Sequence, residues 1–181
     1  MIITLVIIGI LLVLIIIGYN NIVKQKNMVE ESWSQIDVLL KQRFEMIPNL
    51  VEVVKGYSNY EKNILENVVN ARNRELVSTT RDDIIDSDNQ LTQALSKLFV
   101  LTEAYPDLKA DKHYIKLQTS LEELENKIAF ARQFYNDTIL KYNLKIETVP
   151  SNIVAILFGF KKYNYFKVED KERQNVNINL K

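Results

Sequence analysis

The sequence predicts an all-α protein in which an N-terminal transmembrane helix is followed by an up-and-down antiparallel bundle of three or four long helices. The first observation is an uncharged apolar run over residues 2–18. The second is the helical spacing of apolar residues along most of the remaining chain. The third is the shortness of the connections, which makes neighbouring helices antiparallel. We expect an anchor over residues 1–19, a bundle over 20–168, and a polar, mobile tail over 169–181.

The N-terminal run has the composition of a single membrane span. Its 17 residues contain Thr4 as their only polar member, and as a helix they would extend about 25 Å, the short end of the range for a span. A cleaved signal peptide is the alternative, but it needs basic residues before the run and small residues at a cleavage site. Neither is present. We therefore expect an uncleaved, single-pass anchor in the cell membrane, with residues 2–18 in contact with lipid.

The charges beside the run predict an orientation. No charged side chain precedes it, whereas Lys24 and Lys26 follow it closely. The positive-inside rule then places the bundle in the cytoplasm, with an extracytoplasmic bundle as the alternative.

The next segment carries one long amphipathic helical face that begins soon after the membrane exit and also contains Asp37. Pro48 interrupts it by removing a backbone donor and by restricting the preceding residue. The chain either kinks there or turns back into a second helix that ends near Val77, and both alternatives stay open. The apolar residues of this face are Val29, Trp33, Ile36, Leu40, Phe44, Ile47, Val51 and Val54.

The later helices are marked by their ends. Ser87 and Gln90 have the spacing of a capping box, which predicts that a helix begins there and ends near Pro106. Asp111 can cap the long helix that follows, which we expect over residues 111–146.

Charged and amide side chains accompany the apolar stripe of this long helix. Arg132 falls inside the stripe, and Glu125 and Asn136 line its edge. Such groups must be paired by other helices, so we expect a structural polar network that fixes helix register, with Arg132 meeting Asp37 or another carboxylate. The predicted network comprises Asp37, Glu103, Glu125, Arg132 and Asn136, and the predicted core includes Trp33, Leu40, Leu121, Ile128 and Tyr135.

The segment after Pro150 is apolar and aromatic. We expect a short helix and a strand laid on the bundle, covering Phe130 and Phe134, which point away from the main stripe. A packed lid is favoured, and contact with anionic lipid is the alternative, because lysines are interleaved with the aromatic residues. The candidate interaction surface consists of Phe158, Phe160, Tyr163 and Phe166.

Composition disfavours several functions. Lys plus Arg equals Asp plus Glu at 23 each, so no diffuse field attracts nucleic acid. The absence of cysteine removes disulfides and thiol chemistry, and a di-iron bundle is excluded because His113 is the only histidine. The four glycines are scattered and form no phosphate loop. We predict no catalytic residue, no cofactor and no metal site.

Several sequence blocks follow one another in a specific order. They include Trp33-Ser34-Gln35-Ile36-Asp37, Leu40-Lys41-Gln42-Arg43-Phe44, Ile47-Pro48-Asn49-Leu50-Val51, Glu103-Ala104-Tyr105-Pro106-Asp107-Leu108-Lys109-Ala110 and the segment at 125–137. Their order and spacing resemble the LemA family of bacterial membrane proteins, over nearly all of residues 19–166. The resemblance implies a membrane-anchored, up-and-down helical bundle without an established molecular function, and it supplies no catalytic residues. Some relatives look like lipoproteins with a Cys where this chain has Ile17, so a lipid anchor is excluded here.

We therefore predict a membrane-anchored interaction or scaffold protein that is not an enzyme. It would bind a protein partner at the membrane through helix faces, and self-association is a second form of the same activity. The alternative is a regulatory subunit of a membrane enzyme such as a protease, with which relatives of the family are associated. A hydrolase that uses the carboxylate and arginine groups of the polar network is the least favoured alternative.

Overall fold

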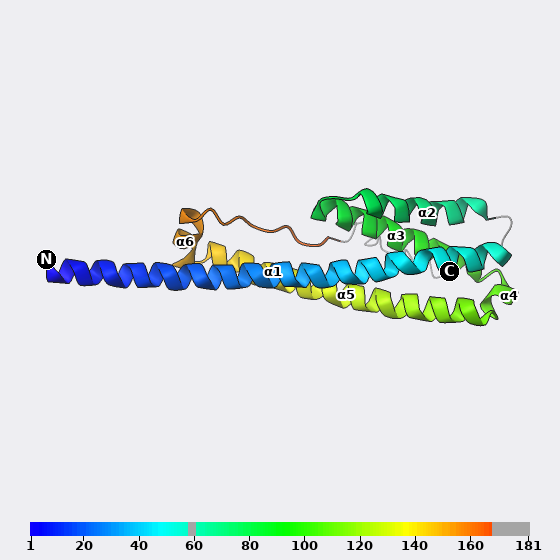
Figure 1. Cartoon of the computed structure of the whole chain (residues 1–181), viewed down its shortest axis with the longest axis horizontal. Helices are drawn as coiled ribbons and strands as arrows, with labels where there is room; N and C mark the ends of the chain where they lie inside the picture. The colour runs from blue at the N-terminus through cyan, green and yellow to red at the C-terminus, as the bar shows by residue number, and fades with distance from the viewer. Residues whose placement is uncertain (58–60, 168–181) are drawn as a thin grey trace, which may run out of the picture. The chain divides into compact units, whose positions relative to one another are not determined.

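The computed structural model describes residues 1–57 and 61–167, and in these residues the secondary structure is helical without strands (Figure 1). The prediction of an all-α protein is confirmed. The predicted mobile tail, 169–181, lies outside the described residues. The helices are α1 (Ile2–Tyr57), α2 (Lys62–Val77), α3 (Arg81–Thr102), α4 (Pro106–Lys109), α5 (Lys112–Glu147) and α6 (Ser151–Leu157).

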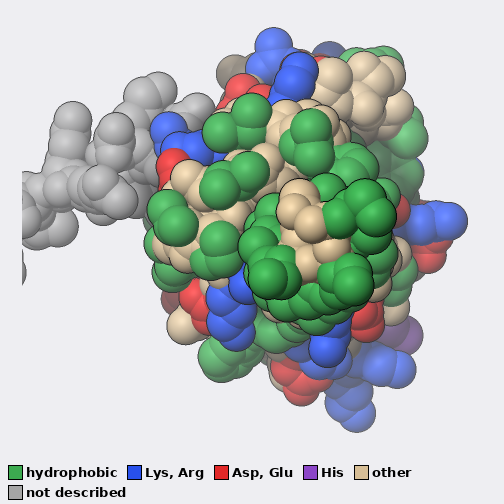
Figure 2. Space-filling model, turned by 90° about the vertical axis from the view of Figure 1, so that its left-hand side faces the viewer, with side chains coloured by type: hydrophobic (Ala, Val, Ile, Leu, Met, Phe, Trp, Pro, Cys, Tyr) green, Lys and Arg blue, Asp and Glu red, His purple; other side chains and the backbone are tan. Residues whose placement is uncertain are grey.

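The N-terminal part of α1 is long and apolar enough to cross a membrane. None of the side chains in its apolar window is buried inside the protein. Figure 2, which faces the N-terminal end, shows hydrophobic side chains gathered there. This is the arrangement that a helix surrounded by lipid requires, because every side chain meets an apolar solvent.

Helix α1 continues through Pro48 and ends at Tyr57. The alternative of a turn at Pro48 was therefore wrong, and the second helix, α2, begins later, at Lys62. A proline inside a helix costs about 3 kcal/mol. Ile47 and Leu50 on either side of it are fully buried, and this burial offsets the missing hydrogen bond.

The described chain forms two compact units, and α1 and α5 contribute to both. The first unit contains Met1–Leu39 and Lys127–Phe166. Its core joins α1 to α5 and to the C-terminal segment through Ile22, Val29, Ile36, Ile128, Tyr135, Ile139, Tyr142, Val154 and Phe166.

The second unit comprises Leu40–Asn126 and, among the described residues, Lys167. Its core takes apolar residues from α1, α2, α3, α4 and α5, so five helices close around one interior. The fully buried members are Ile47, Leu50, Val54, Val68, Leu91, Leu98, Leu108 and Leu121.

Helix α3 begins earlier than its sequence suggested. Thr80 is the N-cap: its hydroxyl accepts a hydrogen bond from the backbone N–H of Asp83, whose carboxylate accepts from the Thr80 backbone N–H. The prediction that Ser87 and Gln90 form the box was wrong, because Asp83 takes the place usually held by Glu or Gln. Ser87 lies instead inside α3 and is buried.

Helix α5 begins where the sequence predicted. The Asp111 carboxylate accepts hydrogen bonds from the backbone N–H groups of His113, at 2.8 Å, and Tyr114, at 2.9 Å. These contacts satisfy two of the amides that a helix start leaves without partners.

The C-terminal segment differs from its prediction. It contains the short helix α6, but residues 158–167 form no strand. It also leaves Phe130 and Phe134 uncovered, because these side chains are 73% and 47% exposed. The expectation of a lid over them was wrong, and an apolar surface stays open on α5.

Candidate functional site

The second unit is organised around a buried arginine. Arg43 follows Leu40 by three residues and precedes Ile47 by four on α1, so it occupies the helix face that also carries these two core residues. Its side chain is fully buried. A charge in this position requires counter-charges and hydrogen-bond acceptors within the core.

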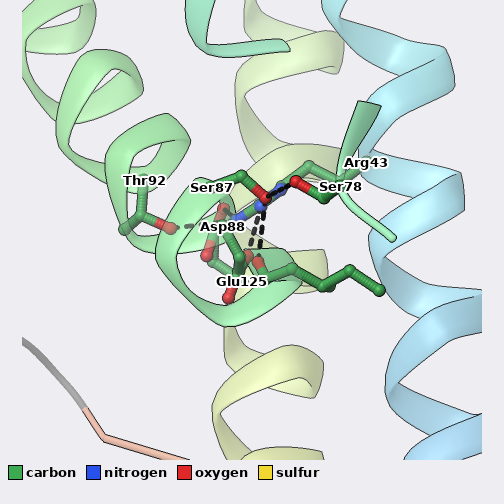
Figure 3. Close-up of polar contacts among 7 residues, drawn as sticks. Arg43, Ser78, Ser87, Asp88, Thr92 and Glu125 are labelled. Atoms are coloured by element: carbon green, nitrogen blue, oxygen red, sulfur yellow. Dashed lines mark hydrogen bonds and ion pairs between the residues drawn. The ribbon is translucent and has the colours of Figure 1, made fainter. Parts of the chain in front are cut away.

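Three side chains from two other helices supply these partners (Figure 3). Arg43 Nη2 forms an ion pair with Asp88 Oδ1 on α3. Arg43 Nη1 donates to Thr92 Oγ1 on α3 at 3.0 Å and to Glu125 Oε1 on α5 at 2.8 Å. Because Asp88 and Thr92 are four residues apart, one face of α3 presents both to the guanidinium. The group therefore ties α1, α3 and α5 together.

The electrostatics of the cluster keep Arg43 charged. Burial by itself lowers the pKa of the Arg43 guanidinium, but the charges of Asp88 and Glu125 and the hydrogen bond to Glu125 outweigh it, and the net pKa is raised. Asp88 is fully buried, whereas 28% of the Glu125 side chain is exposed. One of the two counter-charges is thus fully removed from solvent.

This geometry fixes helix positions. An arginine held by two carboxylates is poorly suited to proton transfer, because its own pKa lies far above neutrality. Among residues 1–57 and 61–167, no group of three or more His, Asp or Glu side chains is arranged to hold a metal ion. The chemistry of the cluster is that of a structural ion-pair network.

The five residues of the predicted polar network divide between the two units. Glu125 belongs to the Arg43 cluster. Glu103 is exposed and accepts from Lys109 Nζ at 2.5 Å. Asp37 and Arg132 belong to the first unit. Asp37 is exposed. The guanidinium carbon of Arg132 lies 4.8 Å from the centre of the Phe166 ring. The pairing of Arg132 with Asp37 stays a prediction.

Arg43 and Asp88, the two fully buried residues of the cluster, were absent from the predicted polar network. Arg43 and Asp88 both lie on core-facing helical positions, with Ile85 and Leu91 three residues to either side of Asp88. A charged residue in phase with an apolar stripe is the signal that marks both residues, and the sequence prediction used this signal for Arg132 and Asp37 instead.

In the first unit, Asn136 holds the C-terminal segment against α5. Its amide nitrogen donates to the Phe166 carbonyl at 3.0 Å, and its oxygen accepts from the Phe166 N–H at 2.8 Å. Asn143 makes the same two contacts with Tyr163, at 3.0 and 3.1 Å.

The spacing of the two asparagines explains this double contact. Seven residues of helix rise about 10.5 Å, and three residues of extended chain cover about 10 Å. Asn136 and Asn143 are seven apart, and Tyr163 and Phe166 are three apart. The helix therefore presents its amides in register with the backbone of the segment.

The predicted core residues lie inside the two units. Trp33 is only partly buried, and its ring packs on Tyr135 with centroids 5.4 Å apart. The others are at most 2% exposed: Leu40, Leu121, Ile128 and Tyr135.

The four residues of the candidate interaction surface have different environments. Phe158 is 51% exposed, and Phe160 and Tyr163 are partly buried. Phe166 is 5% exposed and belongs to the core of the first unit, which removes it from the surface. The rings of Phe158 and Phe160 lie 4.7 and 5.7 Å from that of Tyr19.

The first unit has an open groove between α1 and α5, and several apolar side chains line it. Its volume is about 610 Å³, and its most exposed apolar side chains are Phe130, Val38 and Phe134. The other lining residues are Ser34, Gln35, Leu39, Lys127 and Ala131.

Comparison with known proteins identifies the family. The family model of the LemA family matches residues 32–180. The chain belongs to the LemA family. Family membership and the apolar part of α1 together indicate that this LemA-family chain is a membrane-associated protein.

Similar proteins from three bacteria carry two names. The LemA-family chain is 24% identical over 179 residues to magnetosome protein MamQ 2 of Paramagnetospirillum magneticum, covering 84% of this chain and 66% of the relative. Magnetosome protein MamQ of Magnetospirillum gryphiswaldense is also 24% identical, with 84% of this chain and 65% of the relative covered. Protein LemA of Metamycoplasma hominis is 25% identical over 158 residues, covering 87% of this chain and 72% of the relative. The chain thus spans about two thirds of the length of its magnetosome relatives.

Proposed function

We propose that this LemA-family chain is a single-pass membrane protein that binds a partner protein beside the bilayer through the groove between α1 and α5. The observation that carries the proposal is the exposure of Phe130, Phe134 and Val38 along this groove. Exposed apolar patches of this kind mark interaction sites. Helix α1 supplies both the apolar membrane segment and one wall of the groove.

The occupant we propose is an amphipathic helix of the partner. A groove between two helices suits the apolar face of a third helix. Lys127 is the only charged residue among those that line the groove, and its ammonium group favours a partner helix with a carboxylate at the rim.

The names of the relatives bear on the kind of activity. They are named for LemA or for the magnetosome, and none of these names states a reaction. We propose that this chain acts by binding.

Site-specific photocrosslinking in native membranes tests the groove. A photoreactive amino acid replaces Phe130 in the full chain, or Leu140 as a control on α5 outside the groove lining. We expect an adduct with a second protein from the Phe130 position only. The Phe134→Ser substitution should abolish this adduct, and Leu140→Ser, at a side chain of similar exposure (45% against 47%), should leave it intact.

Two results would contradict the proposal. Equal adducts from both positions would mean that the groove has no selectivity. An adduct that contains only a second copy of this chain would replace the partner protein with self-association.

The orientation we propose has the chain that follows the apolar segment in the cytoplasm, because Lys24 and Lys26 come directly after that segment. Since the chain has no cysteine, a single Val100→Cys variant reports its side through labelling by a membrane-impermeant maleimide. Labelling only after the cells are opened would agree with the cytoplasm, and labelling of intact cells would reverse the assignment.

A further inference from the structure

Helix α6 is apolar on both of its faces. On one face, Val154 and Ala155 are buried inside the first unit. On the other face, Ile153, Ile156 and Leu157 are 64%, 80% and 66% exposed. A helix that is hydrophobic all round belongs in a protein core or in a membrane. The exposed face of α6 therefore needs an apolar environment that the first unit does not supply.

The position of α6 identifies that environment. Figure 1 shows α6 beside α1 and turned across it. The contact lies at Gly18, where a Cβ atom would come within 3.1 Å of Val154 Cγ2. Gly18 is the last residue of the apolar run, so α6 touches α1 where the membrane segment ends.

Aromatic and basic side chains lie together beside the end of the apolar run. The ring of Tyr19, the residue after the apolar run, packs on Phe158, and aromatic residues of this kind gather at the boundary between lipid and water. Lys26 and Lys161 are exposed and line one pocket together with Tyr19 and Phe158. Such lysines attract anionic lipid headgroups.

Side chains of α5 hold the segment after α6 in place. The Tyr142 hydroxyl donates to the Lys161 carbonyl at 2.9 Å. The Asn143 side chain forms hydrogen bonds with both the N–H and the carbonyl of Tyr163. Lys162 forms an ion pair with Glu147. The apolar face of α6 is thus presented from a fixed position.

We propose that α6 and Phe158 insert into the lipid–water interface and form a second membrane contact beside α1, with Lys161 facing anionic headgroups. This inference rests on the proposed membrane anchor. It adds an interfacial helix that orients the first unit on the bilayer, whereas α1 alone would leave the chain free to rotate about its own axis.

Fluorescence quenching in vesicles tests the contact with the full chain. Single-cysteine variants Ile156→Cys, Ile10→Cys and Val38→Cys carry an environment-sensitive fluorophore, and the lipids carry bromine in their acyl chains. Ile10 reports the span. Val38 is a matched control, since it is also apolar and exposed but lies 20 residues beyond Gly18 on α1, which is about 30 Å along the helix.

We expect quenching at the Ile156 and Ile10 positions that is several-fold stronger than at Val38. Quenching at Ile10 without quenching at Ile156 would overturn the interfacial helix and leave the anchor standing, as when a protein covers α6. Absence of quenching at Ile10 would refute the membrane anchor. If quenching at Ile156 were retained in that case, α6 alone would be the membrane contact. If quenching were absent at both positions, both proposals would be refuted.

A second measurement tests the apolar face and the lysine. With the fluorophore at Ile153→Cys, Leu157→Asp should reduce the quenching several-fold. Lys161→Gln should remove the increase that phosphatidylglycerol causes over pure phosphatidylcholine. Circular dichroism confirms that the variants keep their helix content. Unchanged quenching in Leu157→Asp would overturn the proposal.

Discussion

Replacement of Arg43 by methionine tests whether the buried network holds the second unit together. Arg43→Met keeps an unbranched side chain but leaves the Asp88 carboxylate buried without its guanidinium partner. Breaking a buried pair on one side costs about 3–5 kcal/mol of unfolding free energy. For a chain of this length, that loss corresponds to a decrease of roughly 6–20 °C in Tm.

Two further variants show whether the loss of stability comes from the burial of the ion pair or from the removal of a charge as such. Glu103→Gln breaks the Glu103–Lys109 pair, whose side chains are 63% and 46% exposed, and should cost no more than about 1 kcal/mol. The double variant Arg43→Met/Asp88→Leu removes the fully buried carboxylate together with its guanidinium and should regain most of the lost Tm. The carboxylate that then lacks its guanidinium is that of Glu125, whose side chain is 28% exposed and can be hydrated.

Thermal unfolding of the full chain in detergent, followed by circular dichroism, measures all three variants. The reasoning is refuted if Arg43→Met lowers Tm no more than Glu103→Gln does. A double variant as unstable as Arg43→Met would show that the shape of the arginine, and not its charge, stabilises the unit.

The other predictions concern single contacts. Asn136→Ala removes two hydrogen bonds and should cost about 1–3 kcal/mol, seen as faster hydrogen exchange at the Phe166 amide; unchanged protection would contradict the role of Asn136. The pKa of the Asp111 carboxyl group is lowered, chiefly by the hydrogen bond that it accepts from the Tyr114 backbone N–H at the start of α5. The ionised carboxylate therefore stabilises the folded protein fully when the pH is above the pKa of Asp111 in the unfolded chain. This stabilisation is lost as the pH falls through the lower pKa of the folded protein. The Tm difference between wild type and Asp111→Ala should therefore become smaller in acid. A difference that became larger in acid would contradict the lowered pKa of Asp111. Gly18→Leu should displace α6 and weaken its membrane quenching, because a Cβ there already comes within 3.1 Å of another side chain; Gly9→Leu, with open space around it, should have no effect.

Features set by neighbouring residues were predicted best. The end of a helix at Val77 and the cap at Asp111 agree with the structure. The cap at Thr80 was missed because the pattern sought Glu or Gln three residues on, whereas Asp83 fills the position. The path of the chain at Pro48 stayed open in the sequence prediction, because the local cost of a proline is known from sequence and the compensating burial around it is not.

The candidate sites depended on partners that sequence analysis could not assign. Arg43 reaches Asp88, 45 residues away, and Glu125, 82 residues away. Asn136 was recognised as a polar residue beside an apolar stripe, but its partner is backbone 30 residues away.

The sequence by itself determined that this protein is helical, where its apolar membrane segment lies and which family it belongs to. These properties follow from periodicity, composition and motifs, which involve residues close together in the chain. Only the tertiary structure decided which charges neutralise Arg43, that Phe130 stays exposed and that α6 lies at Gly18. These outcomes depend on which faces of distant helices meet, and that choice is made by the packing of the whole unit.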